Sequence, residues 1–213
     1  KREAVALAVA DLITLKTIEK FKKEMKAIPG VVEAHAEIAE MVGPDWVFLA
    51  TTSRADRMNV TVEAAINPKT GENAGLSSVF REGFRRFSGY GSPNKYDAFF
   101  EKMRSTGTPL NIDAAVVVED STSGVKYAKS GRPNLRVIGT VAADFYPNKA
   151  EQAKKLIEAG ASVAVSDMHD LPKALRWLDE GLEQSKKPDF SAKVYTPEDF
   201  PVALTSERTL AMK

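Results

Sequence analysis

Short apolar runs alternate with amphipathic stretches along most of the chain. Four of these runs predict buried parallel strands, at residues 46–50, 114–118, 135–138 and 161–165, and all but the third are followed at once by polar residues. Apolar positions at helical spacing, bounded by Gly and Pro, predict helices at residues 31–41, from 55 onward, 96–105, 123–130, 150–158 and 171–182. This alternation predicts an α/β fold, a doubly wound parallel sheet in three Rossmann-like layers with right-handed crossovers.

Three stretches depart from this alternation. Residues 1–28 contain no Gly or Pro, and Val5, Leu12, Leu15 and Phe21 recur near helical spacing, which predicts one or two helices. Within the turn-rich residues 67–94, arginines and phenylalanines alternate over residues 80–87 and predict an amphipathic helix. Residues 183–213 carry several prolines and little periodicity, so we expect an extended tail that lies along this domain or along a partner.

Composition excludes several classes of function. The chain has 30 Lys and Arg against 29 Asp and Glu, and a net charge of +1 gives no field that would attract nucleic acid or a membrane surface. The longest apolar run, Ala4–Ala10, is far shorter than the roughly 20 residues that span a bilayer. The absence of Cys excludes disulfides and thiolate chemistry, and 2 His are too few for a His-rich metal site. The compartment stays open between the cytoplasm and an organelle such as the plastid stroma.

Polar residues gather where the predicted strands end. Thr51-Thr52-Ser53-Arg54, Glu119-Asp120-Ser121 and Ser166-Asp167 should share the carboxyl edge of the sheet, where ligands of such folds bind. Hydroxyls and amides of the first could hold a phosphoryl group, the acid pair of the second suits Mg²⁺, and Lys95 could add positive charge. Taken singly, each has an ordinary explanation: a strand-to-helix loop with a helix cap, a capping cluster and a solvated surface lysine. Their order along the α/β pattern favours the functional interpretation.

The segment from Val116 to Gly131, Val-Val-Val-Glu-Asp-Ser-Thr-Ser-Gly-Val-Lys-Tyr-Ala-Lys-Ser-Gly, resembles the fourth motif of the haloacid-dehalogenase-like hydrolases. Lys16-Thr17, Pro29-Gly30-Val31 and residues 48–53 look like the end of a helical cap, the return linker and the second motif. This spacing is similar to that of the branch with β-phosphoglucomutase and the sugar-phosphate and xylulose-bisphosphate phosphatases. The resemblance covers roughly residues 12 to 180.

The resemblance implies roles for individual residues. Thr51 would hydrogen-bond the transferring phosphoryl group, while Thr52, Ser53 and Arg54 would contact phosphate oxygens. Lys95 would neutralise the charge of the phosphoryl group and the nucleophile, although residues 93–97 keep the elements of the third motif at a different spacing. Glu119 and Asp120 would hold Mg²⁺ directly or through water.

The first motif of the family, Asp-x-Asp-Gly-Thr/Val with its nucleophilic aspartate, does not occur in the chain. Asp11-Leu12-Ile13-Thr14 lacks the second acid and the glycine. The resemblance then implies that residues 1–28 end a helical cap, that residues 29–182 form a core without its first strand, and that this strand lies upstream. Two explanations remain open: the chain is part of a longer enzyme, or it is a degenerate scaffold. Under either explanation, the 213 residues alone should have no catalytic activity.

The expected function of the complete protein is Mg²⁺-dependent hydrolysis of a small phosphomonoester such as a sugar phosphate. A phosphomutase, which returns the phosphate to the substrate, is not separated from a phosphatase by these residues. The alternative is a non-catalytic subunit of a larger complex that binds a protein partner through residues 183–213 and an open sheet edge.

Overall fold

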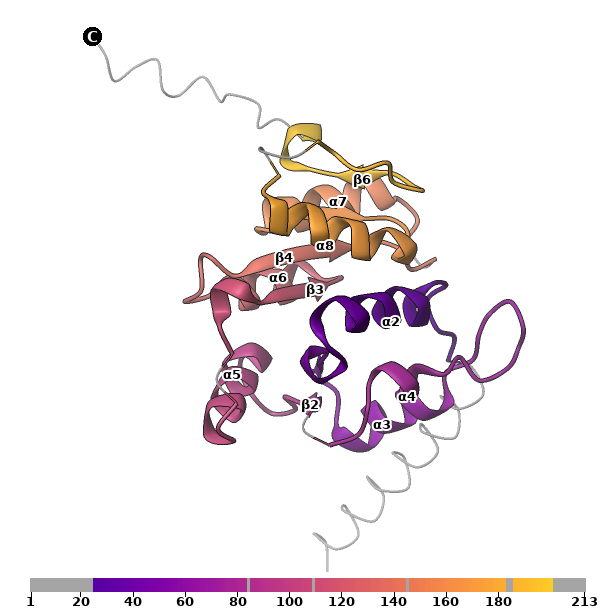
Figure 1. The fold of residues 1–213 in the computed structure, drawn as a ribbon, viewed down its shortest axis with the longest axis vertical. Coiled ribbons are helices and arrows are strands. Elements are labelled where there is room, and N and C mark those ends of the chain that lie inside the picture. Colours follow the sequence, from indigo (N-terminus) through magenta and orange to yellow (C-terminus); the bar gives the residue numbers. More distant parts are fainter. Residues whose placement is uncertain (1–24, 84, 109, 145, 183–185, 201–213) are drawn as a thin grey trace, which may run out of the picture.

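Two groups of strands, parallel except for the last strand, organise the computed structural model (Figure 1). It describes residues 25–83, 85–108, 110–144, 146–182 and 186–200. The strands are β1 (Leu49–Thr51), β2 (Arg86–Ser88), β3 (Val116–Glu119), β4 (Arg136–Thr140), β5 (Val163–Val165) and β6 (Val194–Tyr195). One sheet has the order β3-β4-β5-β6 and the other is the pair β1-β2. The predicted α/β fold with parallel strands is confirmed, but its sheet is in two parts.

Helices connect these strands. They are α2 (Val31–Val42), α3 (Ala55–Ala64), α4 (Leu76–Val79), α5 (Lys95–Ser105), α6 (Thr122–Lys129), α7 (Lys149–Glu158) and α8 (Leu171–Glu180), with single turns of 3-10 helix at η1 (Pro44–Trp46), η2 (Ile112–Ala114), η3 (Met168–Asp170) and η4 (Pro197–Asp199). No helix in the part of the chain that the structure describes is long and apolar enough to cross a bilayer.

The larger sheet is covered on both faces. Apolar residues of α2 and α8 form one buried cluster with Ile138 and Val163, and α2 lies beside α8 (Figure 1). Residues of α5, α6 and α7 form a second cluster with Val137 and Ala164. Neighbouring residues of β4 and β5 thus contribute to opposite clusters, because side chains alternate between the faces of a strand. This arrangement gives the three layers that the sequence predicts.

The predicted helix over residues 80–87 is wrong. Only the short α4 forms, and Arg86 lies in β2, which pairs with β1 in parallel register. The Arg86 guanidinium is buried, 2.7 Å from a Glu63 carboxylate oxygen, and its Nε donates to the Phe80 carbonyl at 2.7 Å. The arginine is therefore a buried structural residue, and its charge is balanced by Glu63, whose side chain is 49% exposed.

Residues 186–200 lie along this domain. Strand β6 pairs antiparallel with β5, and Phe190 packs against Trp177 with ring centroids 5.8 Å apart. The Asp170 side chain is fully buried, and its two carboxylate oxygens accept hydrogen bonds from the backbone N–H groups of Ser191 and Ala192 at 2.7 and 2.8 Å. Of the two placements expected for the C-terminal segment, these residues take the one against the domain. Residues 201–213 lie outside the described part.

We expect the Asp170→Asn substitution to lower the free energy of unfolding by about 2 kcal/mol, because the amide would turn an N–H₂ group toward a buried backbone donor in place of a charged acceptor. Urea denaturation measures the change. Asp189→Asn, at an exposed acid of the same segment, is the matched control and should leave the midpoint unchanged. Equal midpoints for the two variants would show that Asp170 does not anchor this segment.

Candidate active site

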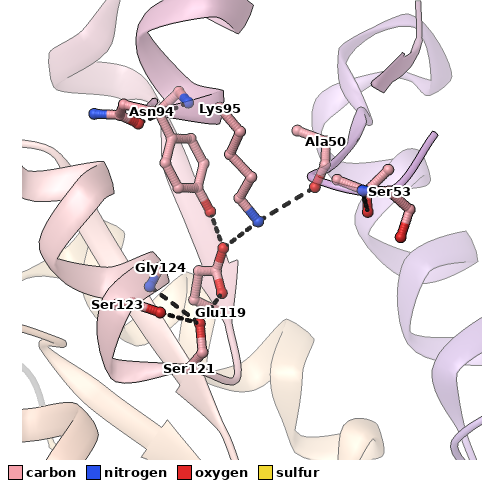
Figure 2. Close-up of polar contacts among 10 residues, drawn as sticks. Ala50, Ser53, Asn94, Lys95, Glu119, Ser121, Ser123 and Gly124 are labelled. Carbon is pink, nitrogen blue, oxygen red and sulfur yellow. Dashed lines mark hydrogen bonds and ion pairs between the residues drawn. The ribbon is translucent and has the colours of Figure 1, made fainter. Parts of the chain in front are cut away.

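Lys95 joins the two sheets at their carboxyl edge. It is the first residue of α5, whose N-cap residue Asn94 accepts a hydrogen bond from the Tyr96 N–H at 2.9 Å. The Lys95 Nζ forms an ion pair with the Glu119 carboxylate at the end of β3 and donates to the Ala50 carbonyl in β1 at 3.4 Å (Figure 2). One ammonium group therefore lies between the strand ends of both sheets.

Glu119 is a buried counterion for this lysine. Its side chain is 5% exposed, and besides Lys95 its Oε1 accepts a hydrogen bond from the Tyr96 hydroxyl. Ser121 donates to the other oxygen at 3.4 Å and caps α6 by accepting from the Gly124 N–H at 3.0 Å (Figure 2). Burial, and then the negative charge of Glu119, raises the pKa of Tyr96, so its hydroxyl stays a donor to this carboxylate.

Gly124 leaves the space that the Glu119 carboxylate occupies. A Cβ atom at this position would lie 2.2 Å from Glu119 Oε2, which no real contact permits. We expect Gly124→Ala to cost about 1–3 kcal/mol of stability by overpacking, even though Ala is the better helix former. Thermal unfolding measures it, and Ser123→Ala at the exposed neighbouring position is the control. A Gly124→Ala variant as stable as the native protein would contradict the close packing of Glu119 against α6.

Asp120 is exposed to solvent, unlike Glu119. Its backbone carbonyl accepts hydrogen bonds from the Tyr146 hydroxyl and the Gln152 amide, both at 3.0 Å. Partial burial, and then the neighbouring charge of Glu119, raises the pKa of the Asp120 carboxyl. The two acids are neighbours in the sequence but have different surroundings. Glu119 is held by the Lys95 ammonium group, and Asp120 is open to solvent.

The loop after β1 presents hydroxyls and backbone amides. The Thr51 Oγ1 accepts a hydrogen bond from the Ser53 N–H at 3.1 Å, and Ser88 donates to the Ser53 carbonyl at 2.6 Å. Thr51 directly follows Ala50, whose carbonyl binds Lys95, so the structure brings this loop to the lysine. Thr52 is exposed in the same loop.

Two predicted site segments make other contacts. The Arg54 guanidinium lies 3.3 Å from Asp56 in the first turn of α3, and both side chains are largely exposed. At the end of β5, Ser166 donates to the Lys193 carbonyl at 2.6 Å and Asp167 accepts from the His169 N–H at 2.9 Å. The contacts of Ser166 and Asp167 thus hold the C-terminal segment and a helix start.

The acids at this edge differ in how well they suit Mg²⁺. No group of three or more His, Asp or Glu side chains gathers as a metal site within the described residues. Mg²⁺ commonly keeps several waters and takes one or two carboxylates besides a substrate phosphate. The open carboxylate of Asp120 fits this pattern directly, whereas an oxygen of Glu119 is already bound by Lys95 and Tyr96.

Sequence reasoning did not assign a role to Tyr96 or Ser88. Tyr96 is buried beside Lys95, and Ser88 ends a strand that the sequence does not reveal. For Tyr96, the available signal was its place directly after the candidate Lys95 at a helix start. For Ser88, the signal was the glycine that follows it. A Cβ at Gly89 would lie 2.7 Å from the Lys95 Cβ, so only glycine lets α5 start so close to β2.

The structure is an α/β protein with parallel strands, covering helices and a lysine-bound acid at the carboxyl edge of its sheets. The chain is similar to the crystal structure of a conserved haloacid dehalogenase-like protein of unknown function from Agrobacterium tumefaciens, with a TM-score of 0.59 and 25% sequence identity over 84% of this chain and 79% of that one. The resemblance is confirmed for the superfamily, not for the helical-cap branch. No protein-family model and no curated protein matches the chain.

Proposed function

We infer that the site belongs to a Mg²⁺-dependent phosphatase that acts on a small phosphomonoester such as a sugar phosphate. The observation that carries this proposal is the position of Lys95, whose Nζ lies between the Ala50 carbonyl and the Glu119 carboxylate. A cation fixed between two strand ends, beside hydroxyls and an open carboxylate, supplies the groups that balance negative charge in phosphoryl transfer.

Each residue has a distinct part in this proposal. Thr51, Thr52, Ser53 and Arg54 would bind the phosphate oxygens through hydroxyls, amides and the guanidinium. Lys95 would neutralise charge on the phosphoryl group, and Glu119 would hold the lysine in place. Asp120 would bind Mg²⁺ directly and Glu119 only through water. When bound, Mg²⁺ supplies positive charge that stabilises the phosphoryl oxygens.

The nucleophile of the proposed reaction lies outside residues 25–200. Glu119 is engaged as a counterion, Asp120 is assigned to the metal, and the Asp-x-Asp-Gly-Thr/Val motif is absent from the chain. We therefore expect residues 25–200 alone to hydrolyse no phosphomonoester. The same proposal covers a phosphomutase, which differs only in where the phosphoryl group is finally transferred.

A docking subunit is the weaker hypothesis. Within the described part of the C-terminal segment, β6 and the Asp170 contacts use the backbone against the domain itself. No contact there favours a partner over this domain, so the phosphatase is the better supported of the two functions.

The test is an assay of the complete natural protein with p-nitrophenyl phosphate and a panel of sugar phosphates, with Mg²⁺ and with EDTA. We expect turnover that requires Mg²⁺ and prefers small substrates. A folded protein that neither turns over these esters nor binds Mg²⁺ in calorimetry would overturn the proposal and favour a non-catalytic role.

A further inference from the structure

The backbone of Asp120 lies in the short link between β3 and α6. Strand β3 ends at Glu119, and α6 begins at Thr122 with Ser121 as its N-cap residue. An N-cap carbonyl is the first acceptor within a helix, and that of Ser121 accepts from the Val125 N–H at 3.0 Å. The Asp120 carbonyl therefore comes before the hydrogen-bond ladder of α6, and its partners come from another part of the chain.

Two side chains from the segment between β4 and the start of α7 converge on this carbonyl. The Tyr146 hydroxyl and the Gln152 amide each donate to the Asp120 carbonyl oxygen at 3.0 Å. Tyr146 lies in the loop that follows β4, and Gln152 lies in the first turn of α7. Because a carbonyl oxygen can accept two hydrogen bonds, these donors satisfy it completely.

Both donors are themselves held in place. Tyr146 is partly buried and packs against the apolar cluster that α6 and α7 form with β4. The Gln152 N–H donates to the carbonyl of Asn148, the N-cap residue of α7, at 3.1 Å. Donors that are fixed in this way also fix the group that accepts from them. The segment from β4 to α7 therefore holds the peptide group that follows the Asp120 side chain.

The link between β3 and α6 is held from a second direction as well. The Ser121 hydroxyl donates to the Glu119 carboxylate at 3.4 Å and accepts from the Gly124 N–H at 3.0 Å. The link is thus tied to α6 through Ser121 and to α7 through the Asp120 carbonyl. The Asp120 side chain, in contrast, is exposed to solvent. A fixed backbone therefore carries an open carboxylate.

We propose that Tyr146 and Gln152 are positioning residues, which hold the Asp120 carbonyl so that the carboxylate is in place before a cation binds. This inference rests on the proposed function, in which Asp120 binds Mg²⁺. Mg²⁺ demands near-ideal octahedral geometry. A carboxylate on a fixed backbone meets this demand with a smaller loss of conformational freedom than one on a loose link. In this role Tyr146 and Gln152 act through Asp120 and do not contact the metal.

Substitutions that keep the shape of each side chain but remove its donor test the proposal. Tyr146→Phe and Gln152→Met are made singly and together in the complete natural protein, and calorimetry measures Mg²⁺ affinity. We expect the double variant to bind Mg²⁺ roughly ten- to a hundredfold more weakly, as is usual when a group that orients a metal ligand is lost. The controls, Tyr127→Phe and Lys154→Met at exposed positions of α6 and α7, should keep the native affinity.

Turnover at increasing Mg²⁺ concentration separates positioning from general damage to the site. In the double variant, excess Mg²⁺ should restore kcat and leave the KM for the phosphate ester at its native value, because the groups proposed to bind the phosphate are unchanged. A kcat that stays low at saturating Mg²⁺ would overturn the proposal. A lower midpoint of urea denaturation with native Mg²⁺ affinity would also overturn it, since Tyr146 and Gln152 would then only stabilise the fold.

Hydrogen exchange of the metal-free protein gives a readout that does not depend on catalysis. The amides of Gly124 and Val125 donate to Ser121 in the link. In the double variant they should exchange roughly threefold faster or more, while the amides of β4 keep their protection. Unchanged exchange would overturn the proposal. A native protein that binds no Mg²⁺ overturns the proposed function and this proposal with it, whereas native binding that the double variant retains in full overturns this proposal alone.

Discussion

Asp120→Asn is expected to lower Mg²⁺-dependent hydrolysis of a phosphomonoester by the complete protein by roughly a hundredfold or more. The reason is that the exposed carboxylate of Asp120 directly follows Glu119, the acid that Lys95 binds at this edge. An amide keeps the shape but loses the charge that attracts the metal. Metal charge is worth several kcal/mol in such transition states, and each 1.36 kcal/mol is a factor of ten in rate.

The measurement compares turnover and Mg²⁺ affinity for Asp120→Asn and Asp113→Asn. Asp113 is an exposed acid in η2, one element before β3, so its variant controls for loss of a surface charge. We expect native stability in both variants and loss of Mg²⁺ affinity in the first only. Full turnover by Asp120→Asn would refute its assignment to the metal.

Alternation along a strand explains why the two acids have different surroundings. Glu119 and Asp120 were expected to act as a pair, yet successive side chains leave a strand on opposite sides. Glu119 turns into the layer of α5 and α6, where Lys95, Tyr96 and Gly124 surround it. Asp120 lies outside this layer and is exposed to solvent. Applied to the end of β3, the period of two would have predicted this division from the sequence.

The sequence predicted elements well where local pattern and tertiary packing agree. Long amphipathic helices such as α5 and α8 end within about two residues of their predicted bounds, because their apolar stripes face the sheet. Strand β2 was missed because its residues, Arg-Phe-Ser, form no apolar run and include a buried arginine. The partner of that arginine, Glu63, lies in another helix, and no local rule connects the two.

The split of the sheet was harder to foresee. The absent motif indicated a missing first strand, but nothing in the sequence indicated the cavity that residues of β1 and β3 line. Lys95 is the residue that links these strands, and its reach depends on the start of α5 against Gly89. The position of Lys95 follows from the packing of distant elements. Neither its distance from the two strands nor its burial can therefore be derived from residue spacing.

The second large effect is expected at Lys95 itself. Lys95→Met should lower the free energy of unfolding by about 3–5 kcal/mol, because it leaves the buried Glu119 carboxylate without its cation. The side chains of Lys95 and Glu119 are 15% and 5% exposed, so solvent can replace little of the lost interaction. Urea denaturation gives the value, and Lys102→Met, at an exposed position of the same helix, is the control with an expected change near zero.

A double variant separates the lost ion pair from lost packing. Glu119→Gln removes the charge but keeps a side chain that can accept from the Tyr96 hydroxyl, so Lys95→Met combined with Glu119→Gln should be more stable than Lys95→Met alone. Such recovery means that most of the cost of the single substitution is the uncompensated charge, as expected when one partner of a buried pair is removed. If the double variant is less stable by the sum of the two single losses, Lys95 and Glu119 are not coupled. Glu119 would then not be the group that positions the lysine between the two strand ends.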